Sequence, residues 1–234
     1  ERMAIPRVKM NELDAEYRSH SRKDEVNLGL NEEQAITEAK RCLDCPNPTC
    51  MNGCPVGINI PKFIKNIERG EFLEAAKTLK ETSALPAVCG RVCPQEKQCE
   101  SQCTHLKAGH KAVAIGYLER FAADYERESG QISVPHIAEK NGIKIAVIGS
   151  GPAGLSFAGD MAKLGYEVTV FEALHEIGGV LKYGIPEFRL PNKIVDVEIN
   201  NLAKMGVTFM KDCIVGKTIS VEDLEAEGFK GIFV

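Results

Sequence analysis

The chain has 234 residues, of which 44% are hydrophobic and 26% charged, and its formal net charge is −4. This length leaves room for more than one hydrophobic core, and the composition is ordinary for a soluble globular protein. The negative charge offers no basic surface for nucleic acid, and the longest apolar run is far shorter than a membrane span, so both classes are excluded and a cytoplasmic, reducing compartment is expected.

The N-terminal residues 1–30 mix charged side chains with Pro6 and show no sustained hydrophobic period. They predict an extended arm that either lies on a partner or is loosely ordered, with a plain flexible terminus as the competing interpretation. The polar stretch 1–23 does not resemble a secretory signal.

Residues 31–130 have the pattern of an all-α domain. Asn31 can cap a first helix, with Gln34 three residues later as in a capping box. Pro61 opens a second helix and a third follows Gly70. A fourth helix is expected over about residues 111–126, where apolar side chains recur at helical spacing.

Eight of the nine cysteines fall within this helical region, in two groups of four. They are Cys42, Cys45, Cys50 and Cys54, and then Cys89, Cys93, Cys99 and Cys103. A proline follows both Cys54 and Cys93. Short-range clustering with Cys-Pro steps is typical of iron–sulfur ligation, so two [4Fe–4S] clusters are expected.

Two other uses of these cysteines compete with iron–sulfur ligation. Disulfides need an oxidising compartment, for which the sequence carries no signal. Structural zinc in two four-cysteine sites fits the count, but only Cys42 and Cys45 have the spacing of a zinc knuckle, and neither group contains a histidine.

A second domain is expected after residues 131–142, a polar stretch with Pro135 that is typical of a linker. Residues 143–148 form a β-branched run that predicts a buried strand, followed by a glycine loop and an apolar helix that ends at Leu164. The next strand is expected over residues 167–171, which completes a βαβ unit. A further helix is expected over 193–205, with strands over 207–210 and from 231 to 234.

The glycine loop of this βαβ unit has the context of a dinucleotide site. It comprises Gly149, Ser150, Gly151, Pro152, Ala153 and Gly154. Phosphates are expected on the amino end of the following helix, where free amides favour anions. Glu172, at the end of the second strand, is positioned to accept hydrogen bonds from a ribose. The loop alone does not separate FAD from NAD.

The order of motifs is similar to one known family. The motifs are Cys42-Leu-Asp-Cys45, Cys54-Pro-Val56, Cys89-Gly-Arg-Val-Cys-Pro94, Ile115-Gly-Tyr-Leu-Glu119, the glycine loop and Gly184-Ile-Pro-Glu-Phe-Arg-Leu-Pro191. From about Glu32 to Val234 the chain resembles the glutamate synthase small (β) subunit family. Relatives of that family include the large subunit of NADH-dependent reduced ferredoxin:NADP oxidoreductase and the N-terminal part of dihydropyrimidine dehydrogenase.

The resemblance implies an interleaved set of cluster ligands. The first cluster would take Cys42, Cys45, Cys50 and Cys103, and the second Cys54, Cys93 and Cys99 with the carboxylate of Glu119. A carboxylate oxygen is a harder ligand than a thiolate, and the competing interpretation of Glu119 is a solvated helix flank. Cys89 would then be a buried thiol that binds no metal, and Cys213 a core residue.

The resemblance also implies an FAD site. Its contacts would be the loop Gly149–Gly154 with Glu172, the pair Gly178 and Gly179, and then Leu181, Arg189 and Val215. Arg189 would place a cation near the flavin or its phosphates, with an ordinary surface arginine as the alternative. Family members continue beyond Val234 into a domain that binds NAD(P)H, so the chain is expected to be an N-terminal fragment without its own nicotinamide site.

The fold expected from these patterns is α+β and multidomain, with an N-terminal all-α, ferredoxin-like domain for two [4Fe–4S] clusters before a partial Rossmann-like α/β FAD domain. The resemblance implies an oxidoreductase that passes electrons between FAD and a partner subunit or domain, with no catalytic acid or base in this part. The partner would be like the glutamate synthase large subunit or, alternatively, a ferredoxin-linked flavoprotein subunit in an electron-bifurcating enzyme. A structural metal-binding interaction module is the alternative of another class.

Overall fold

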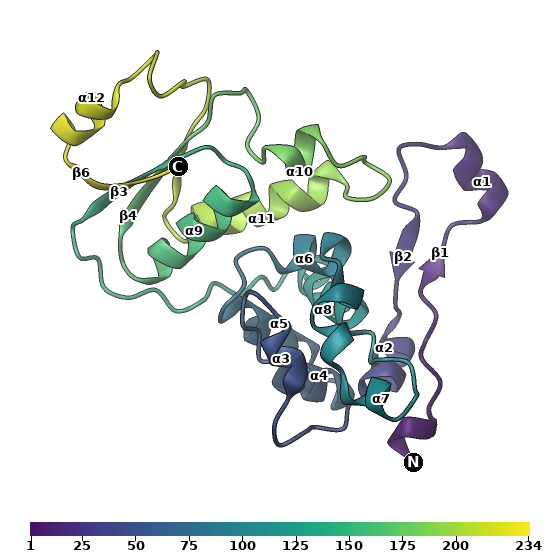
Figure 1. Ribbon diagram of the computed structural model, residues 1–234. Helices are drawn as coiled ribbons and strands as arrows, with labels where there is room; N and C mark the ends of the chain where they lie inside the picture. The colour runs from purple at the N-terminus through teal and green to yellow at the C-terminus, as the bar shows by residue number, and fades with distance from the viewer. The chain divides into compact units, whose positions relative to one another are not determined.

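The computed structural model describes residues 1–234, which divide into two compact units (Figure 1). The first unit comprises residues Glu1–Ser133 with Glu187–Arg189, and the second Val134–Pro186 with Leu190–Val234. The first is mostly helical and the second is built on a parallel sheet. The expectation of mixed helix and strand with a parallel sheet is therefore confirmed. Residues 31–130, predicted to be all-α, contain helices and loops but no strand, and the two short strands of the first unit lie before them.

The first unit contains many short helices. In chain order its elements are η1 (Arg2–Ala4), β1 (Asn11–Glu12), α1 (Ala15–His20), β2 (Asn27–Gly29), α2 (Glu32–Ala39), α3 (Thr49–Asn52), α4 (Ile60–Glu68), α5 (Phe72–Lys80), α6 (Pro86–Val92), η2 (Gln95–Lys97), η3 (Glu100–Gln102), α7 (Thr104–Lys107) and α8 (Ile115–Ser129).

Four of these helices were predicted from local signals. At the start of α2, the Asn31 side chain accepts from the Gln34 amide and the Gln34 side chain accepts from the Asn31 amide, so the capping box is present. Proline lies in the first turn of α4, where its missing N–H costs nothing. The helix α8 begins four residues later than predicted, at Ile115, and ends at a left-handed Gly130.

The N-terminal residues do not form the separate arm that their composition predicted. The strands β1 and β2 pair antiparallel, with α1 between them in the sequence. The guanidinium of Arg2 lies 2.7 Å from Glu68, and the Val8 amide donates to Glu38 at 2.7 Å. These contacts hold the first residues onto the helices of the same unit, and the bond from Val8 satisfies the buried carboxylate of Glu38.

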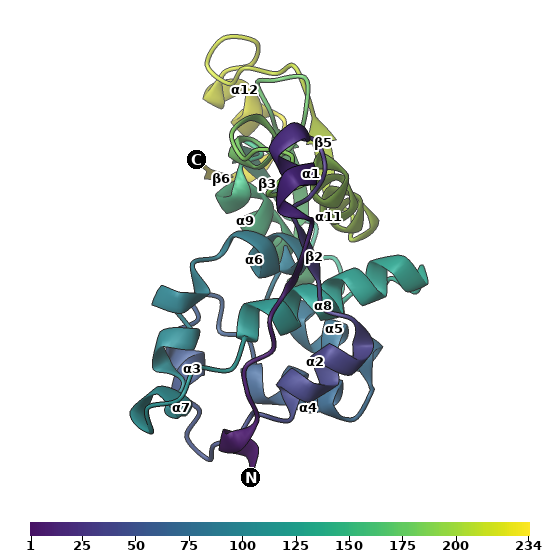
Figure 2. The same ribbon diagram turned by 90° about the vertical axis from the view of Figure 1, so that its right-hand side faces the viewer.

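The core of the first unit lies between α2, α4, α5 and α8, which pack against one another (Figure 2). Phe63, Ile67, Leu79 and Leu118 are fully buried in it. The cysteines lie at the edge of this core, where Cys42, Cys50, Cys54 and Cys103 are partly buried against it. The hydrophobic helices thus provide a low-dielectric wall behind the thiols.

The second unit is a four-stranded parallel sheet in the order β5-β4-β3-β6. Its elements are β3 (Lys144–Ile148), α9 (Pro152–Lys163), β4 (Glu167–Phe171), α10 (Val180–Tyr183), α11 (Asn192–Lys204), β5 (Thr208–Met210), α12 (Val221–Ala226) and β6 (Phe229–Phe233). The predicted βαβ unit is present as β3, α9 and β4, with Ile148 opposite Phe171. The helix α12 was not predicted, although Ser220 and Asp223 form a capping box at its start.

The stretch predicted as a linker, residues 131–142, contains no helix or strand. Its second half is tied to the second unit, because the Ala138 amide donates to Lys163 O at 2.8 Å and the Asn141 amide to Gly165 O at 3.1 Å. No helix of the chain has both the length and the apolar character that crossing a membrane requires.

Candidate iron–sulfur and nucleotide-binding sites

Four thiols line one cavity of the first unit. Cys42 follows α2, Cys45 lies in the next loop, Cys50 is on α3, and Cys103 directly precedes α7. The cavity therefore combines three cysteines of the first sequence group with one of the second. The packing of α3 against η3 brings them together, and the Thr49 hydroxyl fixes it by donating to Gln102 O at 2.5 Å.

The electrostatics of this cavity disfavour free thiolates. Burial raises the pKa of the Cys50 thiol to about 12, and the nearby thiols of Cys42 and Cys103 contribute to the same shift. Burial also raises the pKa of Cys42. Deprotonated thiols in such a place need a positive centre among them, which a bound metal supplies.

The arrangement of the thiols suits a group larger than one ion. No three or more His, Cys, Asp or Glu side chains are placed to hold a single metal ion. In a zinc site, four sulfurs converge at about 2.3 Å on one atom. Thiols that instead surround a cavity fit a [4Fe–4S] cluster, which uses one thiolate at each of four separated irons.

A second group of candidate ligands surrounds Cys99, which is 7% exposed. Burial raises the pKa of Cys99, and the carboxylates of Glu100 and Glu119 and the Cys54 thiol raise it further. Glu119 is itself only 5% exposed, on α8. The interpretation of Glu119 as a solvated helix flank is therefore wrong, because its carboxylate is buried beside thiols.

Cys89 lies in α6, and Cys93 directly follows that helix. Their side chains are hydrogen-bonded, with the Cys89 thiol donating, and this bond lowers the pKa of Cys93. The Glu119 carboxylate lies close enough to raise the pKa of Cys89. Cys89 is half-buried and not fully buried as predicted. Its hydrogen bond places this extra thiol directly beside Cys93, a predicted ligand.

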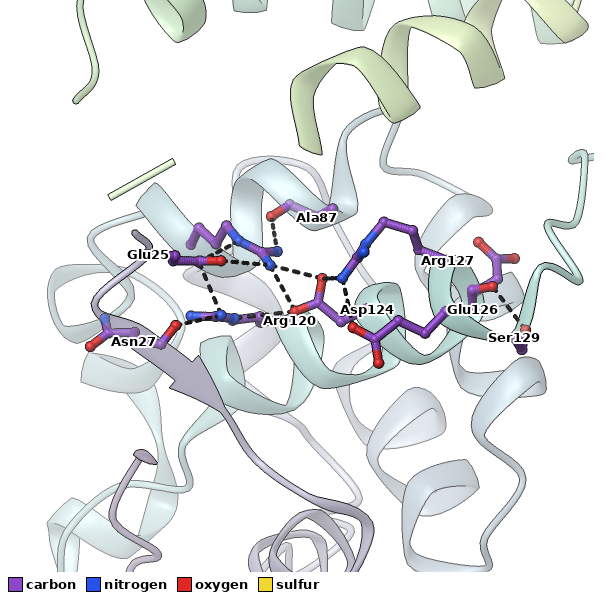
Figure 3. Close-up of polar contacts among 10 residues, drawn as sticks. Glu25, Asn27, Ala87, Arg120, Asp124, Glu126, Arg127 and Ser129 are labelled. Carbon is purple, nitrogen blue, oxygen red and sulfur yellow. Dashed lines mark hydrogen bonds and ion pairs between the residues drawn. The ribbon is translucent and has the colours of Figure 1, made fainter. Parts of the chain in front are cut away.

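A buried ion network joins α6, which Cys93 directly follows, to α8, which carries Glu119 (Figure 3). Arg91 of α6 lies 2.8 Å from Glu25 and 2.8 Å from Asp124, and Arg120 of α8 lies 3.0 Å from Glu25. The two arginine side chains are 2% and 5% exposed. Residue periodicity did not predict this network, although Arg120 and Asp124 have the i, i+4 spacing of a helical ion pair.

A second buried ion pair lies behind the four-thiol cavity. Arg41, next to Cys42, is 2.6 Å from Glu38 and also donates to Ala112 O at 2.8 Å. The Glu38 carboxylate accepts from the amide of Ala114 at 2.8 Å. His105 is buried and lies 2.9 Å from Arg41 O through Nε2, and burial lowers its pKa. These bonds fix the backbone on both sides of the cavity.

The glycine loop connects β3 to the amino end of α9, as the sequence predicted. At Gly154 a Cβ would lie 2.1 Å from Gly149 O, so only glycine allows the helix to approach the strand this closely. At Gly151 a Cβ would meet nothing within 4 Å. Open space in front of Gly151 and the free amides of α9 suit an anionic group there.

Glu172, which was predicted to accept hydrogen bonds from a ribose, is bonded to the glycine loop. Its carboxylate accepts from the Ser150 amide at 2.9 Å, from the Ser150 hydroxyl and from the Leu174 amide at 2.9 Å. Burial alone would raise the pKa of Glu172, but these hydrogen bonds together hold it below the usual 4.5. A ribose hydroxyl would share a carboxylate that already accepts three bonds.

The Gly178–Gly179 pair contacts the same loop. Gly179 has φ +53°, and a Cβ there would lie 2.8 Å from the Cα of Gly151. The Gly178 amide donates to the Ser150 hydroxyl at 2.9 Å. Glycine is required at this approach, because any side chain would displace the loop.

The three remaining predicted flavin contacts are Leu181, Val215 and Arg189, and they differ in burial and in surroundings. Leu181 is buried in the core, so only its backbone is available to a ligand. Val215 follows Cys213, whose amide donates to Glu172 O at 2.9 Å, and Cys213 itself is buried. Arg189 is exposed and groups with the first unit, where Phe188 O accepts from the Val26 amide.

The two parts of the chain match two known protein families. Residues 18–131 match the family described as dihydropyrimidine dehydrogenase domain II, 4Fe-4S cluster. Residues 147–208 match the NAD(P)-binding Rossmann-like domain. The first match spans both cysteine groups, and the second begins just before the glycine loop.

The chain is similar to curated proteins over most of its length. It is 43% identical over 205 residues to the NAD-dependent dihydropyrimidine dehydrogenase subunit PreT of Escherichia coli K12, a match that covers 87% of the chain and 49% of that protein. Its identity to the glutamate synthase [NADPH] small chain is 39% in E. coli K12 and 36% in Azospirillum brasilense, in each case over 86% of the chain and 42% of the relative. The chain thus spans about half the length of the curated relatives it matches, and over that span it is similar to PreT and to the glutamate synthase small chain.

Proposed function

We propose that this chain is the electron-transfer portion of an NAD(P)H-dependent iron–sulfur flavoprotein, passing electrons between FAD and a partner subunit or domain through two [4Fe–4S] clusters. The observation that carries the proposal is the cavity lined by Cys42, Cys45, Cys50 and Cys103. Thiols from two distant sequence groups meet there against an apolar wall. This donor set is typical of a [4Fe–4S] cluster.

For the first cluster, the four thiols of the cavity are the proposed ligands. Cys50, whose pKa burial raises to about 12, would bind as a thiolate only when the positive charge of the cluster offsets that cost. The Glu38–Arg41 pair holds the backbone before Cys42, and α3 carries Cys50. The chain's task here is to keep four sulfurs apart at fixed positions and out of water.

For the second cluster, Cys54, Cys93, Cys99 and the carboxylate of Glu119 are the proposed ligands. Glu119 and Cys54 both raise the pKa of Cys99, which supports the proximity of these three residues. Cys89, hydrogen-bonded to Cys93, is proposed as a neighbour of the ligands and not as a ligand. The network around Arg91 and Arg120 would hold α6 and α8 in register for this set (Figure 3).

For FAD, the proposed contacts are the loop Gly149–Gly154, Glu172 and the Gly178–Gly179 pair, with the backbones of Leu181 and Val215 and the Arg189 side chain. The open space at Gly151 supports phosphate binding at the start of α9. Ser150 joins the loop to Glu172 and to Gly178, which would preform the site. When bound, the flavin would accept two electrons and pass them on one at a time, and each cluster would hold a single electron.

No acid, base or nucleophile of this chain is assigned a chemical step. Its proposed contribution is to orient the cofactors, bury them and adjust the hydrogen bonds to sulfur, which set cluster potentials. NAD(P)H is proposed as the electron donor to the flavin. The compartment is proposed to be the cytoplasm, where thiols stay reduced.

The partner is proposed from the relatives. The glutamate synthase [NADPH] small chain favours a partner like the glutamate synthase large subunit. The 43% identity to PreT favours, as a second candidate, the other subunit of an NAD-dependent dihydropyrimidine dehydrogenase. A ferredoxin-linked flavoprotein subunit of an electron-bifurcating enzyme remains a further alternative of the same class.

Anaerobic purification of the full chain, followed by its visible spectrum and iron content, tests the proposal. We expect a broad band in the blue that dithionite bleaches, flavin peaks, and about eight iron atoms per chain. A colourless chain that carries zinc would overturn electron transfer and favour the structural interaction module. Co-purification of the parent protein with its partner would then separate the three partner classes.

A further inference from the structure

The four-thiol cavity contains a hydroxyl group aimed at one of its sulfurs. Oγ1 of Thr104 lies 3.4 Å from Sγ of Cys45, within hydrogen-bonding distance for sulfur. Thr104 is the first residue of α7, immediately after Cys103, and it lines the same cavity. We propose that Thr104 tunes the first cluster by donating a hydrogen bond to the Cys45 thiolate and so raises the reduction potential of that cluster.

The direction of this hydrogen bond follows from ligation. A cysteine that binds iron is a thiolate without a proton, so Cys45 would be only an acceptor. The hydroxyl of Thr104 has a proton to donate. This inference rests on the proposed function, because it takes Cys45 to be a ligand of the first cluster.

The sign of the effect follows from the charge on sulfur. Reduction adds one electron to the cluster and increases the negative charge on its thiolates. A hydrogen bond to an ionised acceptor is stronger than one to a neutral group, and it strengthens as that charge grows. The bond from Thr104 therefore stabilises the reduced state more than the oxidised state, which raises the potential.

The test compares Thr104→Val and Thr104→Ser with the unmodified full chain, purified anaerobically with its clusters. The measurements are iron per chain and the midpoint potential of each cluster, from a dithionite titration followed by electron paramagnetic resonance. We expect Thr104→Val to shift one of the two midpoints to a more negative potential with iron unchanged. Thr104→Ser, which keeps the hydroxyl, should leave both midpoints in place.

Three results would overturn the inference in distinguishable ways. Unchanged midpoints in Thr104→Val, with full iron content, would show that the hydroxyl does not tune the cluster while leaving the proposed function intact. Loss of iron in Thr104→Val but not in Thr104→Ser would show that the hydroxyl is needed for assembly instead. A chain that binds no iron before any substitution would overturn both the inference and the proposed function.

Discussion

The backbone N–H of Ser150 lies 2.9 Å from Oε2 of Glu172, so the loop after β3 is hydrogen-bonded to the first residue after β4. The Ser150 hydroxyl also donates to Glu172 and accepts from the Gly178 amide. One buried serine thus joins the glycine loop to residues that lie 22 and 28 positions further along the chain. The loop that is proposed to bind FAD is therefore held in place by the protein itself.

Substituting Ser150→Ala should loosen this loop. The change leaves the Gly178 amide without its acceptor, and an unsatisfied buried donor costs about 1–3 kcal/mol. We expect FAD affinity to fall by about tenfold, which corresponds to about 1.4 kcal/mol, in a titration of flavin fluorescence. Ser156→Ala, which removes a hydroxyl of α9 outside this network, is the control. Equal affinity in the two variants would contradict the predicted role of Ser150.

The depressed pKa of Glu172 predicts a dependence of stability on pH. Because the folded-state pKa lies below the unfolded value of 4.5, the ionised carboxylate stabilises the fold above about pH 4.5 and loses this contribution as pH falls through the folded-state pKa. Glu172→Gln should therefore be less stable than the unmodified chain near pH 7, and the difference should shrink towards pH 3. Urea unfolding across this range is the measurement. Parallel stability curves for the two proteins would count against the hydrogen bonds to the carboxylate.

Much of the second unit could be predicted because its signals are local. The strand over 167–171 has the bounds of β4, and the glycine loop lies where the spacing placed it. Asn31 and Gln34 likewise marked the start of α2, because a capping box involves residues only three apart. Signals of this kind depend on neighbouring residues and not on tertiary packing.

What the sequence did not predict depends on contacts between distant residues. The ion pair of Glu25 with Arg91 joins residues 66 positions apart, and it anchors a segment that its composition alone assigned to a loose arm. The meeting of Cys103 with Cys42 followed only from the family resemblance, since η3 must pack on α3 to produce it. The burial of Glu119 is likewise set by packing, because charge alone favours the helix surface.

Substituting Cys103→Ser tests whether the two cysteine groups interleave. Cys103 lines the cavity with Cys42, although it is only four residues from Cys99 in the sequence. We expect Cys103→Ser and Cys42→Ser to lose the same resonance signal, each with about half of the iron. Cys99→Ser should lose the other signal. Iron analysis and low-temperature resonance spectra make the comparison. If Cys103→Ser instead matched Cys99→Ser, each sequence group would bind its own cluster.

Substituting Asp124→Asn should destabilise the first unit. Asp124 contacts Arg91 and Arg120, whose side chains are nearly inaccessible to water, so neutralising it leaves buried cations with one partner fewer (Figure 3). Breaking a buried ion pair costs about 3–5 kcal/mol, whereas an exposed pair contributes about 0–1 kcal/mol. Glu128→Gln, which removes an exposed partner of Arg127, is the matched control. Urea unfolding that shifts equally for both variants would contradict a stabilising role for the network.

Substituting Glu119→Ala tests the only proposed ligand that is not a cysteine. Because the buried carboxylate lies close to the thiols of Cys99 and Cys89, we expect its loss to remove or alter the second cluster, with iron falling towards about half and one resonance signal lost. Glu126→Ala is the matched control, since Glu126 is a buried acid on the same helix that instead bonds Lys80 and Ser133. Glu126→Ala should lower stability and leave the iron and both signals unchanged. Unchanged iron with an unchanged signal in Glu119→Ala would argue against coordination by the carboxylate and would make the neighbouring thiol of Cys89 the next ligand to substitute.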